Sequence, residues 1–86
     1  MAIEKRPHRD ILGKQVVTKE GRKLGIIKDI TFETRTGELI HLVLTTITPY
    51  AGKLNLEASP KGEVLIPYNS IIAISDFVVV SEEDIR

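Results

Sequence analysis

The sequence predicts an all-β domain: a small six-stranded β-barrel with a long loop after the third strand. Short runs of β-branched and aliphatic residues recur along the 86 residues, separated by glycine, proline and polar residues. This is the pattern of a sandwich or barrel. The longest run, residues 23–33, lies between two glycine turns, so antiparallel strands can form around it and close on themselves.

Size and composition fit one domain, residues 1–86. With 42% hydrophobic and 28% charged residues, the chain resembles an ordinary globular protein with a single core. Twelve basic residues balance twelve acidic ones, so we do not expect nucleic acid as the main partner. The chain lacks a signal-peptide pattern and any apolar run near the ~20 residues that span a bilayer. We therefore expect a cytoplasmic protein without direct membrane insertion.

The first nine residues are predicted to form a flexible arm, because they are mostly charged and include Pro7. A second interpretation stays open, in which the cations of this arm contact an acidic partner or nucleic acid. Val16 and Val17 predict a short first strand, since β-branched residues suit a pleated backbone. Residues 19–22 then predict a hairpin turn in which Gly21 adopts a positive φ.

The second strand has an irregular inward-facing set. Leu24 and Ile27 lie three positions apart, whereas side chains on one face of a strand recur every two residues. A β-bulge near Lys28 would supply the extra residue, and it is the preferred arrangement because it bends the strand. In the alternative, Lys28 lies at a barrel end and the inward-facing residues are Leu24, Ile26, Ile30 and Phe32. Gly25 is expected to mark a close approach of another backbone.

The third strand, residues 38–46, is apolar on both faces. One face holds Ile40, Leu42 and Leu44. The other face is also too apolar for free solvent, since a sheet with one wet side alternates cleanly between apolar and polar residues. We expect a second molecule to cover that face, which predicts a homodimer or another protein partner.

Residues 47–62 form a long connection that contains two prolines, and connections of this length tend to be functional or disordered. Leu54 and Leu56 alternate with polar neighbours and could form a brief edge strand. Together with Tyr50 they either pack on their own barrel or contact a partner, and both possibilities stay open. The predicted protein-binding residues are Leu39, His41, Val43, Tyr50, Leu54 and Leu56.

Three further strands are expected at residues 63–67, 71–75 and 77–80. The short acidic tail, residues 81–86, either forms a helical turn capped by Ser81 or frays.

The sequence contains no recognisable catalytic set. Catalysis needs a positioned nucleophile with its base, or a matched acid and base. His8 and His41 lie far apart and no cysteine is present, which leaves no familiar metal-ligand spacing. His41 is interpreted as a packed or hydrogen-bonded strand residue, with a pH-sensitive contact as the alternative. We therefore predict no catalytic residue, no metal, no cofactor and no enzymatic activity.

Residues 11–17 and 20–30 resemble the opening of PRC-barrel domains, and residues 66–74 followed by 77–80 match the second half of that family. The resemblance implies a small barrel over about residues 10–80. As a single barrel with short tails, the chain is similar to small archaeal members of the family. Among these are cell-division proteins that dimerise and bind SepF, the membrane anchor of the FtsZ ring.

The resemblance implies a non-enzymatic adaptor, a homodimer that binds a SepF-like division protein and is recruited to the division site at the membrane through it. The family also includes the second domain of the ribosome maturation factor RimM, so a ribosome- or RNA-associated accessory module is the alternative. Basic residues are enriched in the first third of the chain, but no aromatic-rich stacking platform accompanies them.

Overall fold

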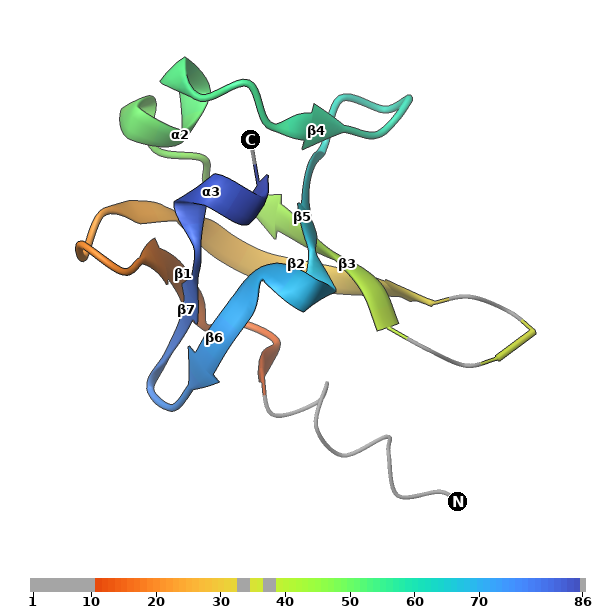
Figure 1. Cartoon of the computed structure of the whole chain (residues 1–86). Helices are drawn as coiled ribbons and strands as arrows, with labels where there is room; N and C mark the ends of the chain where they lie inside the picture. The colour runs from red at the N-terminus through yellow and green to blue at the C-terminus, as the bar shows by residue number, and fades with distance from the viewer. Residues whose placement is uncertain (1–10, 33–34, 37–38, 86) are drawn as a thin grey trace.

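The computed structural model describes residues 11–32, 35–36 and 39–85, except for the side chains of Phe32, Leu39 and Ile40. The predicted arm, residues 1–9, lies outside the described residues. The domain is mostly β and is built on a single sheet of seven strands (Figure 1). The strands are β1 (Gln15–Thr18), β2 (Lys23–Phe32), β3 (Leu39–Thr45), β4 (Glu57–Ala58), β5 (Val64–Pro67), β6 (Ile71–Ile74) and β7 (Phe77–Val80).

The described residues also form the short helices α2 (Pro49–Lys53), η2 (Tyr68–Ser70, a 3-10 helix) and α3 (Glu82–Ile85). The Thr48 side chain caps α2 by accepting a hydrogen bond of 3.1 Å from the Ala51 amide, as an N-cap threonine commonly does. Ala51 in α2 and Ile85 in α3 are both buried in the core. The acidic tail therefore forms a docked helical turn, and the fraying alternative is wrong for Glu82–Ile85.

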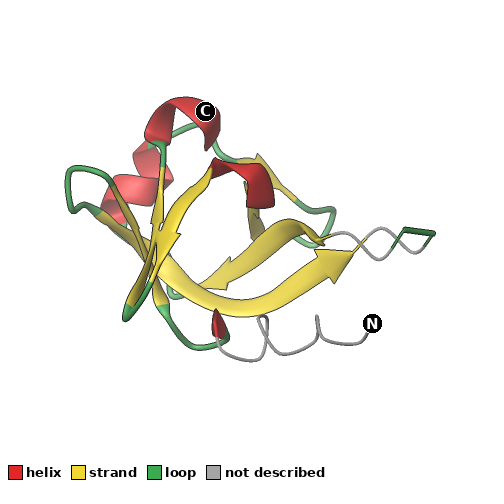
Figure 2. Ribbon diagram, turned by 60° about the horizontal axis from the view of Figure 1, so that its bottom comes forward, coloured by secondary structure: helices red, strands yellow, loops and turns green. Residues whose placement is uncertain are grey.

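The second strand is long, curved and bulged, as predicted (Figure 2). Its register against β3 shifts between Ile27 and Asp29. Leu24 and Ile27 are both buried, whereas Lys28 between the shifted positions is exposed. The Lys28 ammonium pairs with the Glu63 carboxylate at 2.6 Å. The bulge thus lets Ile27 and Ile30, three positions apart, both face the core and leaves the charge of Lys28 in solvent. Leu24 faces the same core through a second shift, in the pairing of β2 with β1, where Val16 lies opposite Gly25 and Val17 opposite Lys23.

Two glycines behave as the sequence predicts. Gly21 has a φ of +86° in the turn between β1 and β2, a conformation that costs glycine little. A Cβ atom on Gly25 would lie 2.9 Å from the backbone oxygen of Thr45. Gly25 therefore permits the close approach of β2 to the end of β3.

The core is formed by aliphatic side chains from the strands and helices. Its buried members are Ile11, Val16, Leu24, Ile27, Ile30, Leu42, Leu44, Ala51, Ile66, Val78, Val80 and Ile85. A parallel pairing joins the two ends of the chain, since β1 lies beside β7 from Gln15↔Phe77 to Thr18↔Val80. This pairing brings the C-terminal strands against the N-terminal hairpin.

The prediction of a closed six-stranded barrel is wrong in two respects. The described strands number seven and follow the order β4-β5-β3-β2-β1-β7-β6, with β4 and β6 as unjoined edges. The seventh strand is β4, within the long connection 47–62, and it uses Glu57–Ala58 instead of the predicted Leu54 and Leu56.

The order of strands nevertheless requires a strongly curved sheet. Only η2, three residues, connects β5 to β6, although four strands lie between them in the sheet. Three residues of 3-10 helix rise about 6 Å, so the end of β5 must lie near the start of β6. The sheet rolls up, but the described pairings leave a seam between these two strands.

Candidate functional site

Exposed apolar side chains gather at the hairpin formed by β6 and β7. Among the described residues, the large exposed hydrophobic side chains are Leu12, Ile47, Ile72, Ile74 and Phe77, and the last three belong to this hairpin. Asp76 is the hairpin's one charged residue. We call Ile72, Ala73 and Ile74 the β6 edge.

The β6 edge is exposed because the sheet ends there. Ile74 lies opposite Val78 in the antiparallel pair of β6 and β7, and residues directly opposite each other share a face of the sheet. Val78 is fully buried, yet Ile74 is 44% exposed. In the described structure β6 has a neighbouring strand only on its β7 side, so nothing shields Ile74 from the other side.

The bulge in β6 adds to this exposure. The pairing shifts between Ile71 and Ala73, so Ile72 has no direct partner in β7. Its side chain is 53% exposed, whereas Ile71 packs against the core. The strand therefore presents aliphatic groups at a free backbone edge.

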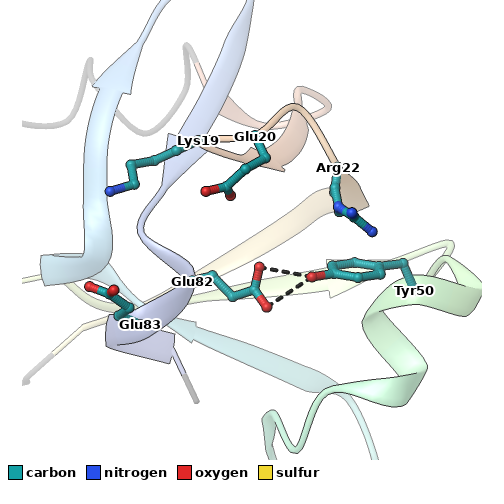
Figure 3. Close-up of a pocket in the computed structure, with 6 residues that line it drawn as sticks. All are labelled: Lys19, Glu20, Arg22, Tyr50, Glu82 and Glu83. Atoms are coloured by element: carbon teal, nitrogen blue, oxygen red, sulfur yellow. Dashed lines mark hydrogen bonds between the residues drawn. The ribbon is translucent and has the colours of Figure 1, made fainter.

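A second feature is a polar pocket of about 370 Å³ between the β1–β2 turn and the two α-helices (Figure 3). It is lined by Lys19, Glu20, Arg22, Tyr50, Glu82 and Glu83. Five of its six lining residues are Lys, Arg or Glu, so side chains of both charge signs line it. A pocket of this size and lining suits charged groups of a partner better than an apolar ligand.

Tyr50 holds the walls of this pocket together. Its hydroxyl donates to both carboxylate oxygens of Glu82, each at 2.8 Å, and the Arg22 guanidinium lies 4.8 Å from the centre of its ring. The hydrogen bond to Glu82, together with desolvation, raises the pKa of the Tyr50 phenol above its ordinary value. These contacts connect α2, α3 and the turn that precedes β2 (Figure 3).

Tyr50 acts in this pocket as a hydrogen-bond donor. The Tyr50 hydroxyl donates a hydrogen bond to a carboxylate and its raised pKa keeps it protonated, which makes it a poor nucleophile. Within the described ranges, no group of three or more His, Asp or Glu residues could hold a metal ion. The arrangement is suited to recognising charge.

The structure distributes the six predicted binding residues over different environments. Tyr50 lines the pocket, and Leu54 and Leu56 are partly buried and pack against the core. The ordered connection thus packs on its own domain, one of the two possibilities left open by the sequence. The binding role of the six residues stays a prediction.

The remaining three lie on β3. His41 is partly buried, and its Nε2 lies 3.2 Å from Oε1 of Glu57. This agrees with the interpretation of a hydrogen-bonded strand histidine. Val43, expected on an outward face, is only 5% exposed in the single chain. The side chain of Leu39 lies outside the described residues.

Sequence reasoning missed the β6 edge, although a signal was present. The strand Ile71–Ile74 reads Ile-Ile-Ala-Ile, without the polar alternation of a strand that has one wet face. Such a run usually indicates a central strand. Only its position at the end of the sheet makes these side chains accessible.

No helix among the described residues is long and apolar enough to cross a membrane. Comparison with known proteins gives two findings. A family model described as the PRC-barrel domain matches residues 4–84. An uncharacterized protein of Methanocaldococcus jannaschii is 30% identical over 84 residues, which cover 98% of this chain and 90% of that protein. The sequence similarity thus extends over nearly the whole domain.

Proposed function

This chain belongs to the PRC-barrel domain family, and from that premise we propose that it is a non-enzymatic protein-interaction module. The observation that carries the proposal is the set of exposed apolar side chains on a free strand edge. Contiguous apolar groups on the surface of a small domain mark a site for another protein. The charged pocket around Tyr50 offers a second contact of different chemistry.

In its sharper form, the proposal is a homodimeric adaptor of archaeal cell division that binds a SepF-like protein. Two observations support this form: the family match extends over nearly all of the chain, and a relative of similar length comes from an archaeon. Recruitment to the division site at the membrane then follows from the partner. No cofactor is required for such a role.

We propose that the charged pocket around Tyr50 is the surface that contacts the SepF-like protein. Arg22 and Glu83 line the pocket and are exposed, and the Tyr50 side chain reaches from α2 to Glu82 on α3. Charged groups at an interface favour one partner over another more than they add affinity. The pocket would therefore select the partner, and salt would weaken the complex.

The test is a titration of a purified SepF-like protein with the wild type and with Arg22→Glu. We expect Arg22→Glu to weaken binding at least tenfold, a loss of about 1.4 kcal/mol. Lys53→Glu provides the matched control, because Lys53 is exposed on α2 and does not line the pocket. Circular dichroism checks that both variants keep the fold.

Equal binding by the wild type and Arg22→Glu would reject the pocket as the contact. Absence of binding to SepF-like proteins would reject the division role. Capture of ribosomal proteins or RNA in a salt-sensitive manner would instead favour the RimM-like alternative.

A further inference from the structure

We propose that β6 is the self-association edge of this protein, and that it pairs antiparallel with β6 of a second copy about a twofold axis at Ala73. The inference rests on the proposed function and names the surface by which copies associate. The paired sheets would form one continuous sheet across the two copies. The pocket around Tyr50 takes no part in it.

The first argument is the unprotected backbone of β6. A strand at the end of a sheet presents unpaired N–H and C=O groups that can pair with another strand. Natural proteins protect such edges with charges, prolines or very short strands. The Ile71–Ile74 strand contains no charge and no proline. Its one protective feature is the bulge at Ile72, and that bulge presents an isoleucine to solvent.

The second argument is that the edge is complementary to itself. The proposed twofold axis passes through Ala73, perpendicular to the sheet. It places opposite each other residues whose side chains point to the same face of the sheet. Ile72 then lies opposite Ile74 of the second copy, and the reverse pair forms on the other side of the axis. Ala73, with the smallest side chain of the strand, lies opposite itself where the two backbones are closest.

The third argument is electrostatic. Asp76 is the one charged residue between Ile71 and Val80. Asp76 lies in the turn after β6, outside the paired strands, and the two aspartates are on opposite sides of the axis. Like charges directly opposite each other would destabilise paired strands, and this register avoids them.

The proposed interface is small, which sets the expected affinity. A standard interface buries about 800 Å² on each partner, whereas the whole accessible surface of this chain is 5502 Å². One four-residue strand, with Ile72 and Ile74 exposed at its edge, supplies less than that standard area. We therefore expect a dimer that dissociates on dilution.

A single-cysteine experiment tests the register directly. The chain has no cysteine, so Ala73→Cys introduces the sole thiol. Opposed Cα atoms in antiparallel strands lie about 4.5–5.5 Å apart, which falls within the range that a disulfide bridges. We expect mild oxidation to convert most of the Ala73→Cys protein to a covalent dimer. The matched control is Ala58→Cys, on the exposed β4 edge, which should stay monomeric on a denaturing gel.

The second experiment measures dissociation by analytical ultracentrifugation. Ile74→Lys places a charge at the pairing edge and should raise the dimer dissociation constant at least tenfold. Ile47→Lys, at an exposed isoleucine away from β6, is the control and should leave it unchanged. Circular dichroism should be the same for all three proteins.

A wild type that stays monomeric at every concentration reached would overturn the proposal, and so would an Ile74→Lys variant that dimerises like the wild type. Equal cross-linking of Ala73→Cys and Ala58→Cys would overturn the register. These outcomes differ from a failure of the proposed function, because a monomer that still captures a protein partner keeps the interaction role and loses only the β6 pairing. If Ile74→Lys removes partner capture from a monomeric wild type, the strand at this edge belongs to the partner.

Discussion

The two edges of the sheet are built in opposite ways. At one end, β4 has two residues, Glu57 and Ala58, and is followed by a proline and a lysine. At the other end, β6 has four residues, all of them aliphatic. Short strands, charges and prolines prevent further pairing. The comparison indicates that the β4 edge ends the sheet, whereas the β6 edge is available to continue it.

A side-chain contact reinforces the difference. Glu57 reaches from β4 to His41 on β3, with 3.2 Å between Oε1 and Nε2. This contact spans β5 and ties the short strand to the body of the sheet. β6 pairs only with β7 among the described strands, and the side chains of Ile72 and Ile74 extend into solvent. The β4 edge is held by contacts within its own domain, whereas the β6 edge has no further neighbouring strand among the described residues.

The largest effect on stability is expected from Val43→Asp. Ile72→Asp, in the other half of the sheet, is the comparison. Val43, on β3 in the half that ends in β4, is 5% exposed. Burial of an unpaired carboxylate there should cost about 3 kcal/mol or more. Ile72→Asp, at a position that is 53% exposed, should change stability by about 0.5 kcal/mol or less. Urea unfolding of both variants, at a concentration low enough for the protein to be monomeric, checks the contrast.

Equal destabilisation by the two aspartates would mean that Ile72 is as buried as Val43 in solution, and the distinction between the halves would fail. The same measurement decides whether Val43 is available to a partner. A folded, stable Val43→Asp variant with weakened binding would restore its predicted role at the surface.

The next effect concerns the middle of the sheet, which both edges share. Gly25→Ala places a Cβ atom 2.9 Å from the backbone oxygen of Thr45, so β2 and the end of β3 must move apart. We expect a loss of about 1–3 kcal/mol, as for other overpacked sites. Gly52→Ala is the control, because a Cβ atom on Gly52 meets nothing within 4 Å. A Gly25→Ala variant as stable as the wild type would contradict the close approach.

A smaller effect is expected from Tyr50→Phe, which removes the bonds between α2 and α3. The pKa of Tyr50 is raised in the folded protein, so the protonated phenol is favoured by folding. Its contribution is complete below the ordinary tyrosine pKa of about 10 and is lost as pH rises through the higher folded value. The wild type should therefore lose more thermal stability in alkali than Tyr50→Phe does.

The comparison with Tyr50→Phe is needed because Glu63 also raises the pKa of Lys28, and both proteins share that second alkaline loss. Parallel curves of melting temperature against pH would show that the hydroxyl of Tyr50 does not stabilise the fold through Glu82.

The smallest effect is expected at the protected edge itself. Glu57→Ala removes the contact with His41, and the Glu57 side chain is largely exposed. Such pairs contribute about 0.5 kcal/mol. Hydrogen exchange of the β4 amides should accelerate while exchange in β7 stays unchanged. Faster exchange across the whole sheet would show that β4 supports more of the fold than its two residues indicate.

The local pattern of residues determined much of this protein. Short runs of aliphatic and β-branched residues predicted six of the seven strands. The irregular spacing of apolar residues in the second strand predicted a bulge near Lys28, where the register shifts, and Gly21 and Gly25 predicted a turn and a close approach. These features depend on the φ angles and side-chain periods of a few neighbouring residues. Strands, bulges and turns of this kind can therefore be predicted from one short segment of the sequence.

Only the tertiary structure decided which strands stand at the edges. The run Ile-Ile-Ala-Ile of β6 is typical of a central strand, and β3, which is apolar on both faces, did not reveal that Val43 is buried. The parallel pairing of β1 with β7, from opposite ends of the chain, sets β6 at the open end of the sheet. Accessibility depends on what lies beside a strand, and that neighbour comes from a distant part of the chain.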